Sequence, residues 1–233
     1  MKAGFLVLLL LVDKSCQSVR FETPQPEGVR NEKSVPKKMQ GTFYEVSKDK
    51  SKSEQEEYLN IKSDLILKHT KDVEVIALST FKETDRREMD SIRRLAGQDS
   101  VYRFSESKGK DTVTVRFMGD SISVKTTDVD TLYSPSPHQL LRKYKGEYYI
   151  STQQTKLWHV VRIRVKGDSL FVRTDSSDDA EKLRQIMGIK NDSITTFRPD
   201  RKQWGTFIKG GGFRSTKKYV RDPTANRQRK GSK

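Results

Sequence analysis

The chain has 233 residues, 33% of them hydrophobic and 33% charged, and its 46 Lys and Arg outnumber its 31 Asp and Glu to give a formal net charge of +15. A single cysteine excludes an internal disulfide framework. The apolar residues gather in short runs, which favours a folded body, and the net charge would attract polyanions over long range without naming one.

The N-terminus has the pattern of an export signal. Met1 and Lys2 precede an apolar run over 4–12, which is too short to span a bilayer as a helix and is typical of a signal peptide. We therefore predict a signal peptide over 1–15, and no later segment is apolar enough to cross a membrane. Ordinary secretion to the periplasm and an uncleaved N-terminal anchor are the alternatives to a lipid anchor.

The only cysteine follows this run. Ser15-Cys16 resembles the lipobox of bacterial lipoproteins, in which the cysteine carries the lipid and becomes the new N-terminus, whereas Asp13 and Lys14 depart from the usual pattern. The resemblance implies lipidation of Cys16 and a membrane-anchored protein. Gln17 lacks the acidic character of an inner-membrane retention signal, so we expect an outer-membrane anchor facing the periplasm.

Residues 16–38 contain three prolines and little apolar periodicity, which predicts a lipid-anchored linker. The segments 21–29 and 36–44 resemble the start of uncharacterised Bacteroidota lipoproteins, in which a Pro-rich tether leads into a Gln-Gly-x-Tyr strand. That group has no known activity, so the resemblance implies location alone.

Three sequence blocks occur twice in the same order, which predicts an internal duplication. They begin at Lys38, Ile92 and Asp99 and return at Lys143, Leu183 and Asp192, and the first block aligns Gly41 with Gly146. We therefore expect a first β unit over 39–133, a linker over 134–142 around Ser134-Pro-Ser-Pro137, and a second β unit over 143–221. The tail, 222–233, has no core-forming residue and is expected to be disordered.

Each copy has the pattern of several strands and one short helix. Apolar residues at helical spacing before Gly97 and before Gly188 predict helices near 85–96 and 178–187, the second with a start resembling a capping box from Asp178 to Glu181. Alternating residues on either side of Gly119-Asp120 and of Gly167-Asp168 predict hairpins with one buried face. The fold class is mainly β with minor α: two tandem antiparallel units, each with one short helix, packed as a sandwich or barrel-like body.

The second copy has a strongly cationic strand. Val161, Ile163 and Val165 alternate with basic residues, so one strand face should be apolar and the other positively charged. The candidate polyanion-binding residues are Arg162, Arg164, Lys166, Arg173, Lys209 and Arg214. Nearby aromatic residues are typical of single-stranded nucleic-acid platforms, but export favours an anionic glycan, a lipid phosphate or an acidic protein over nucleic acid. The alternative is a solvated strand face with Trp158 and Trp204 in the core.

No catalytic or metal-binding constellation is evident. His69, His138 and His159 are widely separated and lack a nucleophile elbow, and their spacing does not suit zinc. Asp85, Asp90, Asp175, Asp178 and Asp179 suit helix N-termini better than a calcium loop. Gly210-Gly-Gly212 lacks the context of a phosphate loop and predicts a bulge or hairpin turn.

The leading functional hypothesis is therefore a non-catalytic envelope lipoprotein, without cofactor or metal, that acts through binding or assembly. The second hypothesis is a protein that binds an anionic envelope polymer or lipid phosphate with its basic face. An envelope hydrolase that uses carboxylates is the third.

Overall fold

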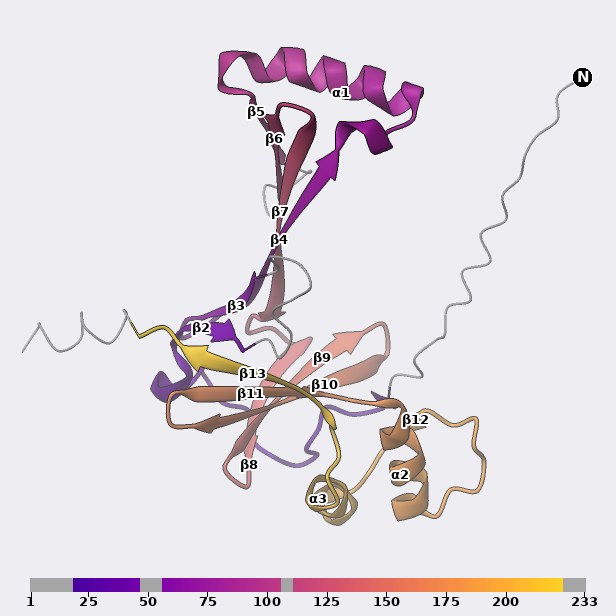
Figure 1. The fold of residues 1–233 in the computed structure, drawn as a ribbon. Helices are drawn as coiled ribbons and strands as arrows, with labels where there is room; N and C mark the ends of the chain where they lie inside the picture. Colours follow the sequence, from indigo (N-terminus) through magenta and orange to yellow (C-terminus); the bar gives the residue numbers. More distant parts are fainter. Residues whose placement is uncertain (1–18, 47–55, 106–110, 224–233) are drawn as a thin grey trace, which may run out of the picture.

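The structure, a computed structural model, describes residues 19–46, 56–105 and 111–223, and Figure 1 traces their fold. The α-helices are α1 (Glu83–Ala96), α2 (Ser177–Met187) and α3 (Arg201–Lys209), and short 3-10 helices cover Lys37–Met39, Leu78–Thr80 and Gly97–Asp99. The strands are β1 (Arg20–Phe21), β2 (Gly41–Glu45), β3 (Glu56–Ile61), β4 (Ile66–Ala77), β5 (Val101–Ser105), β6 (Thr112–Met118), β7 (Ser121–Tyr133), β8 (Gln139–Tyr144), β9 (Glu147–Gln154), β10 (Leu157–Lys166), β11 (Ser169–Thr174), β12 (Thr196–Phe197) and β13 (Ser215–Arg221). The predicted signal peptide, Cys16 and residues 224–233 of the predicted tail lie outside the described residues.

The described strands join into one sheet with the order β12-β1-β10-β11-β13-β2-β3-β4-β7-β6-β5, and β9 pairs with β10 and with β8. The pairs are antiparallel except for β1 with β12. The prediction of a mainly β, antiparallel fold is confirmed. Because β13 pairs with both β11 and β2, the two expected β units share a single open sheet.

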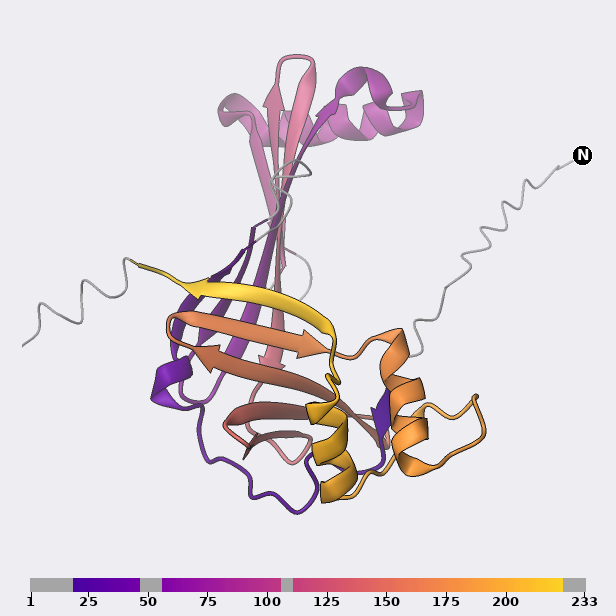
Figure 2. The same cartoon turned by 60° about the horizontal axis from the view of Figure 1, so that its bottom comes forward.

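The body of the molecule is the curved part of this sheet (Figure 2). Val161, Ile163 and Val165 pack in a core with Phe43 and Leu59. These residues belong to β10, β2 and β3, so strands from both halves of the chain enclose one apolar interior. The predicted apolar face of β10 is therefore the inner face of the sheet.

Helices α2 and α3 cover the other face of the sheet at β8 to β10. Trp204 of α3 is fully buried and its ring meets those of Phe21 and Tyr149 edge-on, with centroids 5.5 and 5.6 Å apart. Trp158 of β10 is 8% exposed and belongs to the same core. Both tryptophans thus lie in the core, as the alternative interpretation of the basic strand expected.

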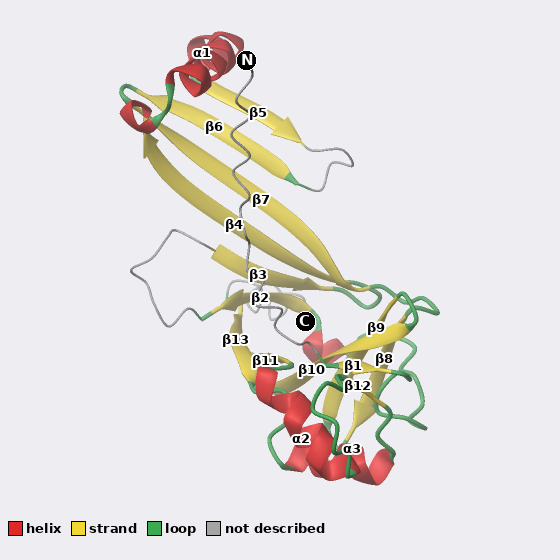
Figure 3. Cartoon of the chain, turned by 90° about the vertical axis from the view of Figure 1, so that its right-hand side faces the viewer, coloured by secondary structure: helices red, strands yellow, loops and turns green. Residues whose placement is uncertain are grey.

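Strands β4 to β7 extend beyond the body as an arm, with α1 across one of its faces (Figure 3). Met89 and Ile92 of α1 pack against Val115, Phe117 and Ile122 of the sheet. The arm therefore has one face covered by α1 and one face on which no helix of the described residues lies.

Local signals placed most of the predicted turns correctly. Helix α1 ends at Gly97 with φ 62° and α2 ends at Gly188 with φ 69°, the left-handed region that favours glycine. The β6–β7 and β10–β11 connections fall at 119–120 and 167–168 as predicted. The capping box of α2 uses Ser176 and Asp179, two residues before the predicted pair.

The linker predicted over 16–38 is corrected from residue 19 onward. Val19, Phe21 and Val35 are each 1% exposed, and β1 adds to the sheet beside β10 and β12. Val19 and Phe21 alternate over only three residues and Val35 stands apart from them, so the sequence gives no extended periodic signal, but tertiary packing buries all three. The linker predicted over 134–142 is also shorter, because β8 begins at Gln139 and pairs with β9.

The second half contains a third helix where the sequence predicted a hairpin. Asp200 caps α3 by accepting hydrogen bonds from the N–H groups of Lys202 and Gln203, both at 2.8 Å. Gly210 ends this helix, so the glycine triplet follows a helix and is not a strand bulge.

Both halves contain a three-stranded meander, a helix and a last strand that pairs with the third strand of the meander: β7 with β4, and β13 with β11. Between the helix and the last strand the halves differ, with a β5–β6 hairpin in one and β12 with α3 in the other. The duplication itself stays a prediction. Within the described ranges, no helix combines the length and the apolar character needed to cross a bilayer.

Candidate anion-binding face

Arg162, the centre of the predicted basic face, is buried, which corrects the prediction that it faces solvent. Its side chain is 8% exposed, Nε donates to Glu147 Oε2 at 2.6 Å, and Nη1 donates to the Gly212 carbonyl at 3.1 Å. The segment between α3 and β13 covers Arg162 of β10, and Phe213 of this segment belongs to the core. Strand alternation predicts which face a side chain occupies but not what packs over that face.

The other predicted cations do not form one uncompensated patch. Arg164 is half exposed and lies 3.8 Å from Glu147, and Arg214 forms a 3.1 Å ion pair with Asp178 of α2. Lys166 and Lys209 are exposed at the ends of β10 and α3.

Arg173 lies opposite Arg162 on β11. Its pKa is lowered by burial and by the charge of Arg162, and its Nε has no hydrogen-bond partner among the described residues.

A different group of cations lies on the arm. Arg103, Thr114 and Lys125 are opposite one another across β5, β6 and β7, and Arg116 follows two residues along β6. Because side chains alternate between the faces of a strand, these residues share the face that α1 leaves uncovered. We call this face, made by the outward side chains of β4 to β7, the open face; it includes Lys71, Arg103, Thr112, Thr114, Arg116, Lys125 and Thr127.

The carboxylates of the arm strands all lie on the opposite face. Strands β5 and β6 contain no Asp or Glu, and the acidic residues of β4 and β7 are Asp72, Glu74, Asp128 and Asp130. They alternate in phase with Ile76 and Ile122, which pack beneath α1. These strands therefore place all their carboxylates on one face, which also holds Lys68, 3.1 Å from Asp130, and none on the open face.

The cations of the open face have few partners of opposite charge. Arg103, Arg116 and Lys125 make no ion pair with any residue in the described ranges. Lys71 lies 3.0 Å from Glu56, and this hydrogen bond raises the pKa of the lysine. The carboxylate of Asp111, just before β6, accepts a hydrogen bond from the Val129 N–H at 3.2 Å.

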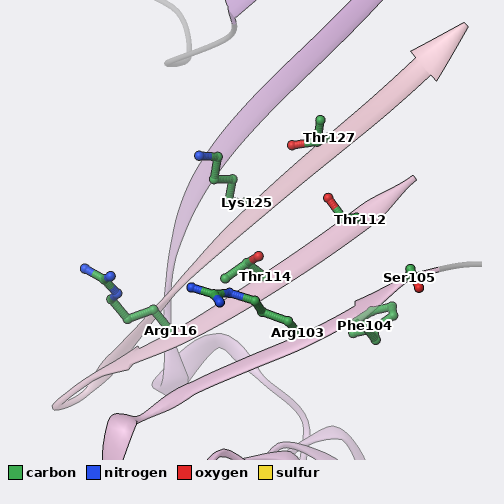
Figure 4. A pocket seen from close by; sticks show the side chains of 8 residues that line it. All are labelled: Arg103, Phe104, Ser105, Thr112, Thr114, Arg116, Lys125 and Thr127. Carbon is green, nitrogen blue, oxygen red and sulfur yellow. The ribbon is translucent and has the colours of Figure 1, made fainter. Parts of the chain in front are cut away.

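A depression of about 580 Å³ lies on the open face between these side chains. Figure 4 shows Arg103, Arg116 and Lys125 on the same side of the strands, with Thr114 between Arg103 and Lys125 and with Thr112 further along β6. Guanidinium, ammonium and hydroxyl groups all donate hydrogen bonds to anionic oxygens. The open face can therefore hold several oxyanions along its length.

Part of the open face could be predicted from the sequence. Thr114 and Arg116 alternate with the apolar residues of the β6–β7 hairpin, so one hairpin face was predictably polar. Adding Lys125 to that face requires the hairpin register, and adding Arg103 requires the pairing of β5 with β6. The basic strand over 161–166 looked stronger because its three cations are closely spaced in sequence.

The histidines have separate local contacts. His159 Nε2 lies 3.1 Å from Asp175 Oδ1, while Asp175 Oδ2 accepts the Val19 N–H at 2.7 Å, which fixes the N-terminal segment. His138 Nδ1 lies 2.7 Å from Gln153 Oε1. His69 stacks on Tyr58, and its pKa is lowered by burial and by Lys71. No three His, Cys, Asp or Glu side chains gather at a position suited to a metal ion in the described part of the chain.

Comparison of the chain with protein-family models, with curated proteins and with solved structures found no match.

Proposed function

We propose that this protein is a non-catalytic binding module of the cell envelope that holds an extended anionic polymer along its open face. The observation that carries the proposal is the separation of charge on the arm: Arg103, Arg116 and Lys125 lie on a face to which β4 to β7 contribute no carboxylate. Lipidation of Cys16 would tether this module to the outer membrane, on the periplasmic side.

The arrangement suits a polymer better than a single small anion. The rows containing Lys71, Lys125 and Arg116 follow one another along the strands, at about 7 Å per row because a strand rises about 3.3 Å per residue. Repeated anionic groups can therefore meet successive cations. The high overall positive charge adds long-range attraction.

The test is retention of the purified full chain on immobilised heparin, used as an anionic polymer, over a salt gradient. The double variant Arg103→Glu, Arg116→Glu should elute at clearly lower salt. The matched control is Arg87→Glu, Arg94→Glu, which makes the same change in net charge on α1, across the sheet from the open face. The control should elute much closer to the wild-type protein.

Equal shifts in the salt concentration at which the two double variants elute would mean that retention depends on net charge and not on this face, and would overturn the proposal. Failure of the wild-type chain to bind heparin at low salt would overturn it as well. A lipopolysaccharide column, run with the same proteins, gives the same comparison with an anionic envelope polymer.

A further inference from the structure

Strand β5 forms the end of the sheet at the arm. It pairs with β6, and no other described strand lies beside it. The Phe117 N–H donates to the Ser100 carbonyl at 2.9 Å, and hydrogen-bonded pairs alternate along an antiparallel ladder. The backbone groups of Tyr102 and Phe104 therefore point toward β6, whereas those of Val101, Arg103 and Ser105 point outward from the sheet.

These outward groups have no backbone partner in the described residues. Natural edge strands are commonly protected by charged side chains, by proline, by a bulge or by a covering segment, and the only charged side chain of β5 is Arg103. Strand β5 has no proline, and its register with β6 is regular over all five residues. An edge of this kind is a template to which an extended segment of another chain can add as a further strand.

The side chains of β5 indicate what such a segment would contain. Arg103 lies on the open face, and Tyr102 and Phe104 lie on the other face with ring centroids 6.0 Å apart. Phe104 is 41% exposed, which is unusual for a phenylalanine within a sheet. A neighbouring strand would therefore meet a cation on one face and aromatic rings on the other.

A second copy of this chain is a poor occupant. If β5 paired antiparallel with itself around its central residue, the two Arg103 side chains would be direct cross-strand neighbours, and like charges opposite each other are destabilising. An acidic side chain at that position would be attracted to Arg103 instead.

We propose that β5 binds an extended segment of an acidic protein partner, in which acidic residues alternate with apolar ones. The acidic side chains lie beside Arg103 on the open face, and the apolar side chains cover Tyr102 and Phe104. The main-chain groups of Val101, Arg103 and Ser105 supply the hydrogen bonds. This interaction uses the edge of the sheet and does not depend on the proposed polymer binding, although both involve Arg103.

The test uses the full chain and a fluorescent eight-residue peptide in which Val and Glu alternate, with binding followed by fluorescence anisotropy. The control peptide has the same composition as four Val followed by four Glu. The alternating peptide should bind at least about tenfold more tightly than the control, since only it matches both faces at once. Equal binding of the two peptides would overturn the proposal, as would no binding of either.

Two variants test the edge itself. Ser105→Pro removes an outward N–H without removing a hydrogen bond to β6, and it should weaken binding of the alternating peptide about tenfold. Ser105→Thr keeps the N–H and should bind the peptide like the wild-type chain. Thermal unfolding checks that the proline variant is folded. As a second measurement, the bound peptide should slow hydrogen exchange at the amides of Arg103 and Ser105.

Unchanged exchange at these amides with the peptide bound would place it elsewhere and overturn the proposal. Heparin retention of the wild-type chain is measured in parallel. Loss of peptide binding with retention intact contradicts the edge proposal alone, and loss of retention with peptide binding intact contradicts the polymer proposal alone.

Discussion

Tyr219 of β13 donates its hydroxyl to the carboxylate of Glu57 of β3 inside the curved sheet. Glu57 Oε2 also accepts a hydrogen bond from Lys217 Nζ at 2.7 Å. The three residues connect β13 to β3 across β2, and Tyr219 also belongs to the apolar core. A charge buried in this way depends on its hydrogen-bond donors.

Replacing Tyr219 with Phe should lower the free energy of unfolding by about 1–2 kcal/mol, since the Glu57 carboxylate loses one of its donors while it stays buried. Urea denaturation measures the change. Tyr44→Phe, at a residue that is 37% exposed, serves as the control and should change stability by less than about 0.5 kcal/mol. Equal effects of the two substitutions would contradict this account of Glu57.

Stability should fall at alkaline pH. Burial and the hydrogen bond to Glu57 raise the pKa of Tyr219, and burial raises the pKa of Tyr149. In each case the folded state keeps a proton that the unfolded state loses near pH 10, so the stabilisation is complete below that pH and is lost as the pH rises further.

Above about pH 10 the free energy of unfolding should fall by up to about 1.4 kcal/mol per pH unit for each of the two tyrosines. Unfolding measured between pH 9 and 11 should therefore depend less steeply on pH in Tyr149→Phe and in Tyr219→Phe than in the wild-type chain. A wild-type slope retained in both variants would argue against these pKa shifts.

Neighbouring arginines of β10 should differ in their effect on stability. Arg162→Ala leaves Glu147 buried without its main partner and should cost about 3–5 kcal/mol, as is usual when one member of a buried ion pair is removed. Arg164 is half exposed, so Arg164→Ala should cost less than about 1 kcal/mol. Comparable losses of unfolding free energy in the two variants, measured by chemical denaturation, would mean that Arg162 does not stabilise the fold through Glu147.

Gly212 lies directly beneath the ring of Phe207. A Cβ atom at this position would be 2.5 Å from Phe207 Cζ, and the ring is fully buried. Gly212→Ala should therefore destabilise the protein by about 1–3 kcal/mol through overpacking. In a Phe207→Leu background the same substitution should cost less, and a fully additive double variant would show that the two positions do not compete for space.

Cys16→Ala should abolish incorporation of a radioactive fatty acid into this protein in growing cells, because the cysteine is the proposed site of acylation. Ser18→Ala, a neighbouring substitution that keeps the cysteine, is the control and should be labelled like the wild-type chain. Label retained in Cys16→Ala, or missing from the wild-type chain, would contradict the anchor.

Local sequence signals predicted the features that depend on neighbouring residues. Gly97 and Gly188 end helices because glycine adopts positive φ without strain, and Gly119 and Gly167 mark hairpins for the same reason. Helix α3 was missed although Trp204, Phe207 and Ile208 have helical spacing, since the glycines at 210–212 were interpreted as a bulge or hairpin turn. Its Asp200 cap is visible only once the helix is assumed.

The candidate site was less predictable because it depends on contacts distant in sequence. Arg162 has the alternation of a solvent-facing residue, but the segment that covers it lies about fifty positions later in the chain, at Gly212. Similarly, Arg103 and Lys125 become members of one face only through the registers of β5, β6 and β7. A pattern within one strand cannot report either relationship.

The position of β13 between β11 and β2 has a consequence for how the molecule folds. Hairpins such as β6–β7 and β10–β11 close short loops and can form early, whereas the pairing of Tyr219 with Glu45 closes a loop of most of the chain. The two meanders should therefore organise independently, and the docking of β13 should be the slow step that joins them. Until that step the inner apolar surfaces are exposed, so during folding the protein is most vulnerable to aggregation or proteolysis before its final strand is in place.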